Sequence, residues 1–525
     1  MNSNSLCPRL HGRRMDAEPA LPKKTQQQRA PRGERTFPAN LLTAATMLGA
    51  VLATAALVAG CASTAGVKPA SQALMQPAQA GATAADTPWP QADWWNAWGD
   101  AQLDGLIEKA LASAPSMQTV QARLVQAQAA VDAAGAARAP QVNGSLDMSD
   151  QRFTKNGAVP PPLAGTIRWN NSATIGASWE LDLFGRQRAA LASAVGQLRA
   201  GQADAQAARV LLASNIASGY VNLARLIDAR DVSRAALSQR QQTVSLVDQR
   251  IRAGLDTNVE LRQAEGFIAQ TQVDIEAAEE GIARARHALA ELTGQGPNAL
   301  DGLTPKIAEV KALPLPQGLP ADLLGRRADL VAQRWRVEAA TKDVAVARAQ
   351  FYPNINLAAF IGLSSIGLDN FLKAGSETYG IGPALHLPIF DGGRLRANLS
   401  ARNAEVDAAV DGYNAALLRA LREVADELST LQSLERQQRA QADALKSAES
   451  AYDLATQRYR SGLGNYLVVL TAETNVLAQR RAVTDLKARH LNAEAALARA
   501  LGGGYLGEAP ASPTLAQGAG ASITR

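Results

Sequence analysis

Apolar residues recur at alternating intervals of three and four positions over long stretches of the chain. Leu421, Val424, Leu428 and Leu431 follow this spacing, and so do Ala213, Ile216, Tyr220 and Leu223. The spacing predicts helices packed side by side as in a coiled coil, with small residues in the seams. We expect two very long helices at 186–252 and 394–460, each rising about 100 Å. An ordinary helical bundle gives the same spacing, but helices of this length exceed a compact domain.

Shorter helices are expected before and after each long one. The pattern predicts them at 103–138, with a break at Pro115, and at 258–292, 321–350 and 466–500. The lengths of the helices at 258–292 and 321–350 add up to nearly one long helix. We therefore expect these two helices to stack end to end. The Gly- and Pro-rich segment 293–320 would then form a belt between them at mid-height.

Four further segments alternate apolar and polar residues with a period of two. Their apolar positions are Val142, Gly144, Leu146 and Met148; Ile175, Ala177, Trp179, Leu181 and Leu183; Ile355, Leu357, Ala359 and Ile361; and Tyr379, Ile381, Leu385, Leu387 and Ile389. A half-buried sheet of a soluble protein is the commoner source of alternation. Segments of about ten such residues also fit transmembrane β-strands, with apolar side chains toward lipid and polar ones toward a lumen. We favour the membrane interpretation because a membrane-targeting signal and very long helices accompany it.

Four strands cannot close a barrel alone, and open sheet edges are not tolerated in lipid. Several chains must therefore combine their strands. Two chains would give eight strands, and three chains would give twelve.

The same order of elements occurs twice, at a constant offset of 208 residues. The pairs include Arg186 with Arg394, Leu191 with Leu399, Gly254 with Gly462, Leu289 with Leu497 and Gly294 with Gly502. One offset without gaps indicates a true duplication, because chance similarity between Ala-rich helices would drift. We expect a first repeat at 91–300, a linker at 301–320 and a second repeat at 321–504.

The start of the chain reads as a targeting signal. A basic leader precedes Leu41–Ala59, which contains no charged residue, and the sequence then reads Val58-Ala59-Gly60-Cys61. This resembles a bacterial lipobox and predicts a lipoprotein signal peptide over 1–60. Cys61 would carry diacylglycerol and an N-acyl chain such as palmitate. The alternative is a single transmembrane anchor, since the apolar stretch is just long enough.

The segments that flank the repeats are rich in small and polar residues. We expect 61–90 to be a flexible tether that follows the lipid anchor, and 505–525 to be a disordered tail. The excess positive charge of the chain lies in its first 60 residues, which leaves the remainder near neutrality. No general basic field is therefore available to attract nucleic acid.

Enzymatic motifs are missing from the sequence. The three histidines beyond the leader, His287, His386 and His490, are widely spaced and do not form a His-Glu-x-x-His pattern. A Gly-x-Ser-x-Gly elbow and a Gly-Lys-Ser/Thr phosphate loop are also missing. The two cysteines, Cys7 and Cys61, offer no Cys-based metal site. We expect no catalytic residue, no metal and no cofactor apart from the lipid.

Several motifs together resemble a known family over residues 90–504. They are WWNAWGDAQLDGLIEKAL, SWELDLFGR, FYPNINL, LPIFDGGRLRA, RYRSGLGNYLVVL and ALGGGY. The chain resembles the TolC-like outer-membrane efflux factors, in particular the NodT-type efflux outer-membrane lipoproteins. The family usually has Arg-Arg-Pro-Asp where this chain reads Arg326-Arg327-Ala328-Asp329.

The resemblance implies a mainly helical fold with a transmembrane β-barrel. Three chains would form a twelve-stranded barrel in the outer membrane of a Gram-negative bacterium and a twelve-helix tunnel through the periplasm. The homotrimer would dock a periplasmic adaptor (membrane fusion) protein and an inner-membrane transporter of the RND type. It would be the exit duct for small molecules. The alternative is a coiled-coil membrane scaffold lipoprotein that conducts nothing.

The resemblance also places the two repeated turns at the periplasmic tip, where the tunnel closes. Leu467 falls where related lipoproteins have a gate leucine, next to Val468. Three apolar side chains converging on one axis can exclude water from a narrow pore. The alternative is that Leu467 fills a coiled-coil seam. Thr471 and Thr474 stand where relatives often have Asp and Arg, so an electrostatic lock at this turn is not expected.

The first turn carries acids instead. Asp256 and Glu260 would form a cation-attracting ring in three copies, or would simply be solvated charges at a helix end. Arg250 and Arg458 are expected to hold neighbouring hairpins through hydrogen bonds to carbonyls or carboxylates. Gly254 and Gly462 are expected to permit left-handed turns, with adaptor docking as a further role.

Overall fold

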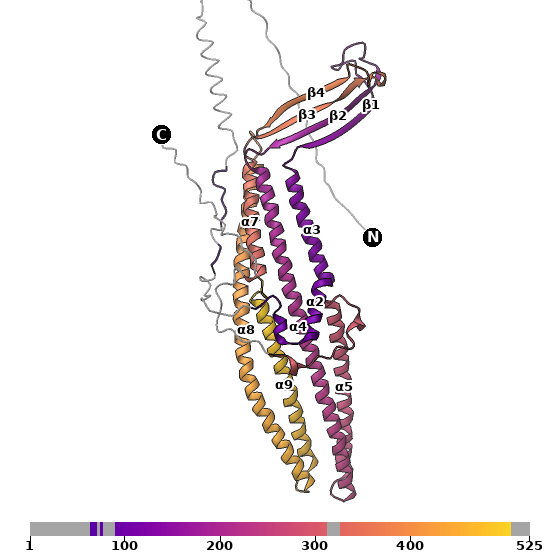
Figure 1. Cartoon of the computed structure of the whole chain (residues 1–525), viewed down its shortest axis with the longest axis vertical. Coiled ribbons are helices and arrows are strands. Elements are labelled where there is room, and N and C mark those ends of the chain that lie inside the picture. The colour runs from indigo at the N-terminus through magenta and orange to yellow at the C-terminus, as the bar shows by residue number, and fades with distance from the viewer. Residues whose placement is uncertain (1–63, 71–73, 77–89, 312–325, 506–525) are drawn as a thin grey trace, which may run out of the picture. The chain divides into compact units, whose positions relative to one another are not determined.

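The protein is analysed as a computed structural model, which describes residues 64–70, 74–76, 90–311 and 326–505 (Figure 1). The predicted signal peptide, the lipidation residue Cys61 and the tail beyond Tyr505 lie outside the described residues. All the described residues belong to the unit that runs from Cys61 to the end of the chain.

The long helices begin and end where the sequence predicted. They are α4 (Arg186–Arg252) and α8 (Arg394–Arg460), of 67 residues each. The returning helices α5 (Asn258–Leu292) and α9 (Tyr466–Ala500) have 35 residues each, again with the predicted bounds. A glycine with positive φ precedes each long helix: Gly185 before α4 and Gly393 before α8. Because glycine has no Cβ, it adopts this conformation at little cost and marks the helix boundary sharply.

The first helix of each repeat is shorter. The predicted helix 103–138 is divided into α2 (Ala101–Ser113) and α3 (Pro115–Ala136). The division falls where expected, because Pro115 occupies the first position of α3 and the preceding Ala114 is extended. In the second repeat α7 covers Ala328–Ala349. The predicted start of this helix, at 321–325, lies outside the described residues.

The end-to-end stacking of short helices differs from the prediction. Both α7 and α9 pack between α4 and α8, and α5 and α3 both pack on α4 (Figure 1). A Cβ at Gly502, just after α9, would lie 1.8 Å from the carbonyl oxygen of Arg326, just before α7. A Cβ at Gly294, just after α5, would lie 2.7 Å from the ring of Pro115 at the start of α3. Each returning helix therefore stacks on the first helix of its own repeat.

The predicted pairing of 258–292 with 321–350 is thus wrong. Length could not identify the partner, because the returning helices of the two repeats are equally long.

An apolar cluster surrounds the middle of α4. Trp94, Trp95 and Trp98 form a 3₁₀ turn, Trp94–Trp98, and their rings meet edge to face. The cluster also includes Ile216 and Leu223 of α4, and, from the predicted belt at 293–320, Leu300, Ile307 and Val310. The Trp98 indole donates a hydrogen bond of 3.2 Å to Glu494 of α9. The described part of the linker therefore lies at mid-height, where the sequence placed a belt.

The four strands form one antiparallel sheet in the order β1-β2-β3-β4. They are β1 (Gln141–Arg152), β2 (Ile167–Leu181), β3 (Asn354–Ile366) and β4 (Glu377–His386). Leu183, Leu387 and Ile389 were predicted within strands but lie beyond the ends of β2 and β4. Beyond Leu181 the carboxylate of Asp182 accepts hydrogen bonds from the N–H groups of Gln187 and Arg188, so the chain turns into α4.

The sheet leaves large apolar side chains exposed. On one face Val142, Leu146, Ile175, Ile361 and Ile381 are all more than half exposed. The outer edges of β1 and β4 pair with no other strand of the described chain. Such a sheet is incomplete by itself and requires both an apolar surrounding and further strands.

Parts of the predicted tether lie against α8. The Ala70 N–H donates to the carboxylate of Asp407 at 3.0 Å, and the Met75 N–H donates to the amide oxygen of Asn414 at 2.9 Å. Val67, Leu74 and Met75 also pack on the apolar cluster around α8. The sequence predicted a flexible tether here, but these described residues make specific contacts instead.

Candidate functional site

The two turns that end α4 and α8 have the same backbone. At the first turn Leu255 N–H donates to Arg250 O at 2.9 Å, and at the second Leu463 N–H donates to Arg458 O at 2.8 Å. Gly254 and Gly462 have φ values of 76° and 77°, and no atom lies within 4 Å of an added Cβ at either glycine. The left-handed backbone, and not crowding, therefore requires glycine at both positions.

The helices that leave the turns begin with different caps. In the first hairpin Thr257 and Glu260 form a reciprocal capping box, in which the Thr257 N–H donates to the Glu260 carboxylate at 2.9 Å. The hydrogen bonds from Thr257 lower the pKa of Glu260. In the second hairpin the Asn465 side chain accepts from Val468 N–H at 3.2 Å. Glu260, for which we considered an acidic ring or a solvated charge at a helix end, thus caps the start of α5.

A buried network joins the two hairpins. The guanidinium of Arg250 donates to both carboxylate oxygens of Asp256, at 2.8 and 3.2 Å, and to the Tyr459 carbonyl at 2.8 Å. The Tyr459 hydroxyl also donates to Asp256, and the guanidinium lies 4.3 Å from the centre of the Tyr459 ring. Arg250 thus makes both kinds of hydrogen bond that we expected, to a carbonyl and to a carboxylate.

The electrostatics of Asp256 follow from these contacts. The side chains of Arg250 and Asp256 are only 9% and 8% exposed. Burial opposes ionisation of Asp256, but the hydrogen bonds from Arg250 and Tyr459 outweigh it, so the pKa of Asp256 is lowered. The charge of Asp256, considered above either for an acidic ring or as a solvated charge at a helix end, is therefore buried and neutralised within the chain.

The equivalent network is missing from the second repeat. At the 208-residue offset Asp256 corresponds to Gly464, and Tyr459 corresponds to Ile251. Arg458, the counterpart of Arg250, is exposed. The described residues thus contain one such joint, made of pieces from both hairpins.

Apolar side chains project from the tips without partners in the described chain. Leu467 is 59% and Val468 is 54% exposed, while their neighbours Val469 and Leu470 are buried in the cluster that holds the hairpins together. Leu467 therefore fills no seam within the described chain, and a seam with a neighbouring chain stays the alternative to a gate. Thr471 is exposed, and its hydroxyl donates to the Leu467 carbonyl at 2.8 Å.

A second buried ion pair lies further from the tip, and sequence reasoning missed it. Arg240 of α4 approaches Glu473 of α9 to 3.5 Å and donates to the Phe267 carbonyl and the Thr271 hydroxyl of α5. Burial raises the pKa of Glu473, and burial together with this carboxyl raises the pKa of Tyr466 to about 12. Arg240 corresponds to Ala448 at the repeat offset, so the duplication gave no signal for this pair.

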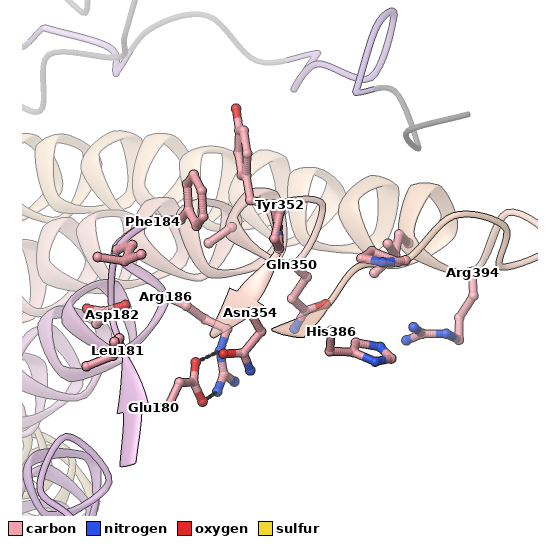
Figure 2. A pocket seen from close by; sticks show the side chains of 15 residues that line it. Glu180, Leu181, Asp182, Phe184, Arg186, Gln350, Tyr352, Asn354, His386 and Arg394 are labelled. Carbon is pink, nitrogen blue, oxygen red and sulfur yellow. Dashed lines mark hydrogen bonds and ion pairs between the residues drawn. The ribbon is translucent and has the colours of Figure 1, made fainter. Parts of the chain in front are cut away.

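A polar cavity of about 300 Å³ lies at the other end of the helices, where strands and helices meet (Figure 2). Arg186 forms a two-point ion pair with Glu180 there, with one contact of 2.9 Å. The rings of Phe184 and Tyr352 stack beside it at 4.8 Å, and both are about half exposed. Amphipathic rings of this kind are typical of the level where a membrane meets water.

The fold and the tip together define a class of protein. Two repeats place an unfinished, apolar-faced sheet at one end of long helices and paired turns at the other. This is the architecture of an outer-membrane channel whose strands cross the membrane and whose helices extend from it.

The family follows directly from sequence comparison. Residues 106–295 and 319–503, more than half of the chain, match the family model described as "Outer membrane efflux protein". The chain belongs to this family, as the motif resemblance predicted. The protein is therefore an outer-membrane efflux channel.

Named relatives agree with this assignment. The chain is 40% identical to the fusaric acid resistance protein FusA of Burkholderia cepacia over 373 residues, covering 69% of this chain and 70% of FusA. It is 32% identical to the multidrug resistance outer membrane protein MdtP of Escherichia coli, covering 80% of this chain and 88% of MdtP. The crystal structure of the outer membrane protein VceC of Vibrio cholerae superimposes with a TM-score of 0.73 at 37% identity, covering 79% of this chain and 100% of VceC.

Proposed function

We propose that three copies of this protein form the exit duct of a tripartite efflux system. The observation that carries the proposal is the sheet, which combines an exposed apolar face with two unpaired edges. In lipid each edge must pair with a strand of another chain, and three chains complete a barrel of ordinary size. The long helices of the three chains then complete a tunnel.

Native mass spectrometry of the detergent-extracted protein tests the assembly, and we expect a trimer. Planar-bilayer recording of the same preparation tests conduction. A trimer that inserts but never conducts ions would favour the alternative, a membrane scaffold without a channel.

We further propose that the tips dock a periplasmic adaptor protein, which links the duct to an inner-membrane transporter of the RND type. The exposed apolar residues Leu255, Val259 and Leu463 at the turns support a docking surface. Crosslinking in cells followed by affinity purification of the duct should recover one adaptor and one transporter. Recovery of the duct alone would contradict this part of the proposal.

The mouth of the tunnel closes, in this proposal, through an apolar constriction. Leu467 and Val468 support it, because they are exposed beside a buried cluster that fixes their helix. Rings of apolar side chains close a pore by excluding water.

The cargo and the anchor follow from other observations. The names of FusA and MdtP support organic acids and drug-like molecules as cargo. Loss of the gene should lower the inhibitory concentration of such compounds. The lipobox sequence supports a lipid on Cys61. Intact-mass measurement of the mature protein should show the diacylglycerol and the acyl chain, and Cys61→Ser should remove both.

A further inference from the structure

The sheet register separates two faces at the end nearest the helices. Glu180 lies opposite Asn356, and Asn354 lies opposite His386, so these polar side chains share one face. The residues on the other face at this level are Leu181, Ile355 and Leu385. In a membrane barrel the apolar face meets lipid and the polar face lines the water-filled lumen. Glu180, Asn354 and His386 therefore face the lumen at the base of the barrel.

Two equivalent arginines begin the long helices beside this lumenal face. Arg186 is neutralised by Glu180. The position equivalent to Glu180 in the second repeat is Pro388, so Arg394 has no such partner. Its electrostatic neighbour is Asp391, whose carboxylate oxygens already accept hydrogen bonds from N–H groups at the start of α8.

Arg394 and His386 lie in the same open cavity of about 300 Å³ (Figure 2). In Figure 2 the guanidinium of Arg394 extends from the start of α8 toward the ring of His386, while the Asn354 amide lies nearer the Glu180–Arg186 pair. Both Arg394 and His386 are exposed. Two carboxylates also line the cavity, but Glu180 pairs with Arg186 and Asp182 pairs with Arg188. The side chains of Arg394, His386 and Asn354 make no hydrogen bond to a carboxylate among the described residues, so the cavity offers a planar cationic donor, a ring donor and an amide.

We propose that this cavity is a lumenal binding site for carboxylate-bearing cargo. We call it the barrel-base site, made of Asn354, His386 and Arg394. The Arg394 guanidinium matches the two oxygens of a carboxylate, and His386 and Asn354 supply further donors. The inference rests on the proposed function, because the site meets cargo only in an open channel.

The exposure of Arg394 suits a site that binds cargo briefly as it passes and then releases it. A conduit needs sites that attract an ion but also release it, and rings of arginine favour anions in pores. A trimer would carry three barrel-base sites at one level of the lumen. They would raise the local concentration of anions where cargo leaves the helical tunnel and enters the barrel.

The test uses the purified trimer in planar bilayers of uncharged lipid, with sodium benzoate as the carboxylate probe. Reversal potentials in a KCl gradient give the chloride-to-potassium permeability ratio. We expect Arg394→Gln to lower this ratio by about threefold and to weaken the block of chloride current by benzoate by a similar factor. Arg394→Lys should keep the ion selectivity but lose most of the benzoate block, because lysine cannot bind two oxygens in a fork.

Arg396→Gln is the matched control. It removes the same charge two residues further along α8, where the guanidinium donates to the Ala65 carbonyl of the tether. We expect wild-type selectivity and wild-type benzoate block. Unchanged selectivity and block in Arg394→Gln would overturn the site, and so would loss of trimers in that variant, because Arg394 would then be a subunit contact. A wild-type trimer that never conducts would refute the proposed duct. Calorimetry with benzoate then tests the site separately: binding to the wild type that is lost in Arg394→Gln supports the site, and equal binding overturns it.

Discussion

At the scale of single residues, the two repeated turns have taken different tasks. The first turn contributes Arg250 and Asp256 to a buried network, and the second contributes Tyr459 to that network and presents Leu467. Sequence reasoning found Arg250 and the turn glycines from the duplication. It could not find the partner of Asp256, because Tyr459 lies 203 positions away and has no equivalent in the other repeat.

The apolar closure of the mouth predicts an asymmetry between equivalent positions. Leu467 in the second turn corresponds to Val259 in the first. Leu467→Ala removes apolar volume from the constriction, so single-channel conductance in planar bilayers should rise several-fold. Val259→Ala is the matched control and should change conductance much less. Equal effects of the two substitutions on conductance would show that the second turn does not close the pore by itself.

The buried network predicts a pH dependence at the tip. The pKa of Asp256 is lowered from its ordinary value of 3.8, so its ion pair stabilises the closed tip above that pH. The stabilisation disappears as the pH falls through the lowered pKa. Asp256→Asn should therefore increase conductance at neutral pH and remove the further rise that we expect of the wild type on acidification. The Asp256→Asn substitution also leaves the buried donors that contact Asp256 poorly satisfied, which lowers the stability of the tip by about 1–3 kcal/mol. A variant that retains the acid response would contradict the assignment.

At the scale of elements, the sequence predicts most helix boundaries but fewer of the contacts between helices. The bounds of α4, α5, α8 and α9 follow from glycines and caps, which act locally. The stacking of α5 on α3 and of α9 on α7 could not be derived from length, because the repeats are equally long. The Arg240–Glu473 pair was missed for a related reason, since it joins the two repeats and the counterpart of Arg240 in the second repeat is Ala448.

The docked tether gives a prediction at this scale. Asp407 and Asn414 of α8 accept hydrogen bonds from the backbone of Ala70 and Met75. The double substitution Asp407→Ala and Asn414→Ala should free these residues, so that limited proteolysis cleaves the tether several times faster. Asp411→Ala, between them on α8, is the control. Equal cleavage of all variants would show that the apolar contacts of Val67, Leu74 and Met75 suffice.

At the scale of the whole molecule, one chain leaves surfaces that another copy must cover. No residue of α3 is buried, although Leu124 packs toward α4, and Val125 on α3 is 62% exposed. The unpaired edges of the sheet also require a neighbouring chain in the membrane. The alternating pattern already indicated that several chains combine, since it requires a closed barrel.

A charge on the uncovered face of α3 should therefore disturb assembly. Val125→Asp places a carboxylate where we expect a neighbouring chain, and its burial without a partner costs several kcal/mol. We expect fewer trimers in native mass spectrometry. Gln126→Asp adds the same charge at an adjacent exposed position and should leave trimers intact. Full recovery of trimers for Val125→Asp would show that this face of α3 is not part of the subunit interface.

The joint between the turns also fixes the symmetry of the assembled mouth. In the proposed trimer, six turns with the same backbone would give the tip an approximately sixfold shape. The Arg250–Asp256–Tyr459 joint occurs once per chain, between the two hairpins of that chain. Six turns are thus divided into three bonded pairs, and only a threefold axis survives. While the joint is intact, the two hairpins of a chain would move as one couple; breaking it, as acid or Asp256→Asn should do, would let the mouth open within each chain as well as at the three seams between subunits.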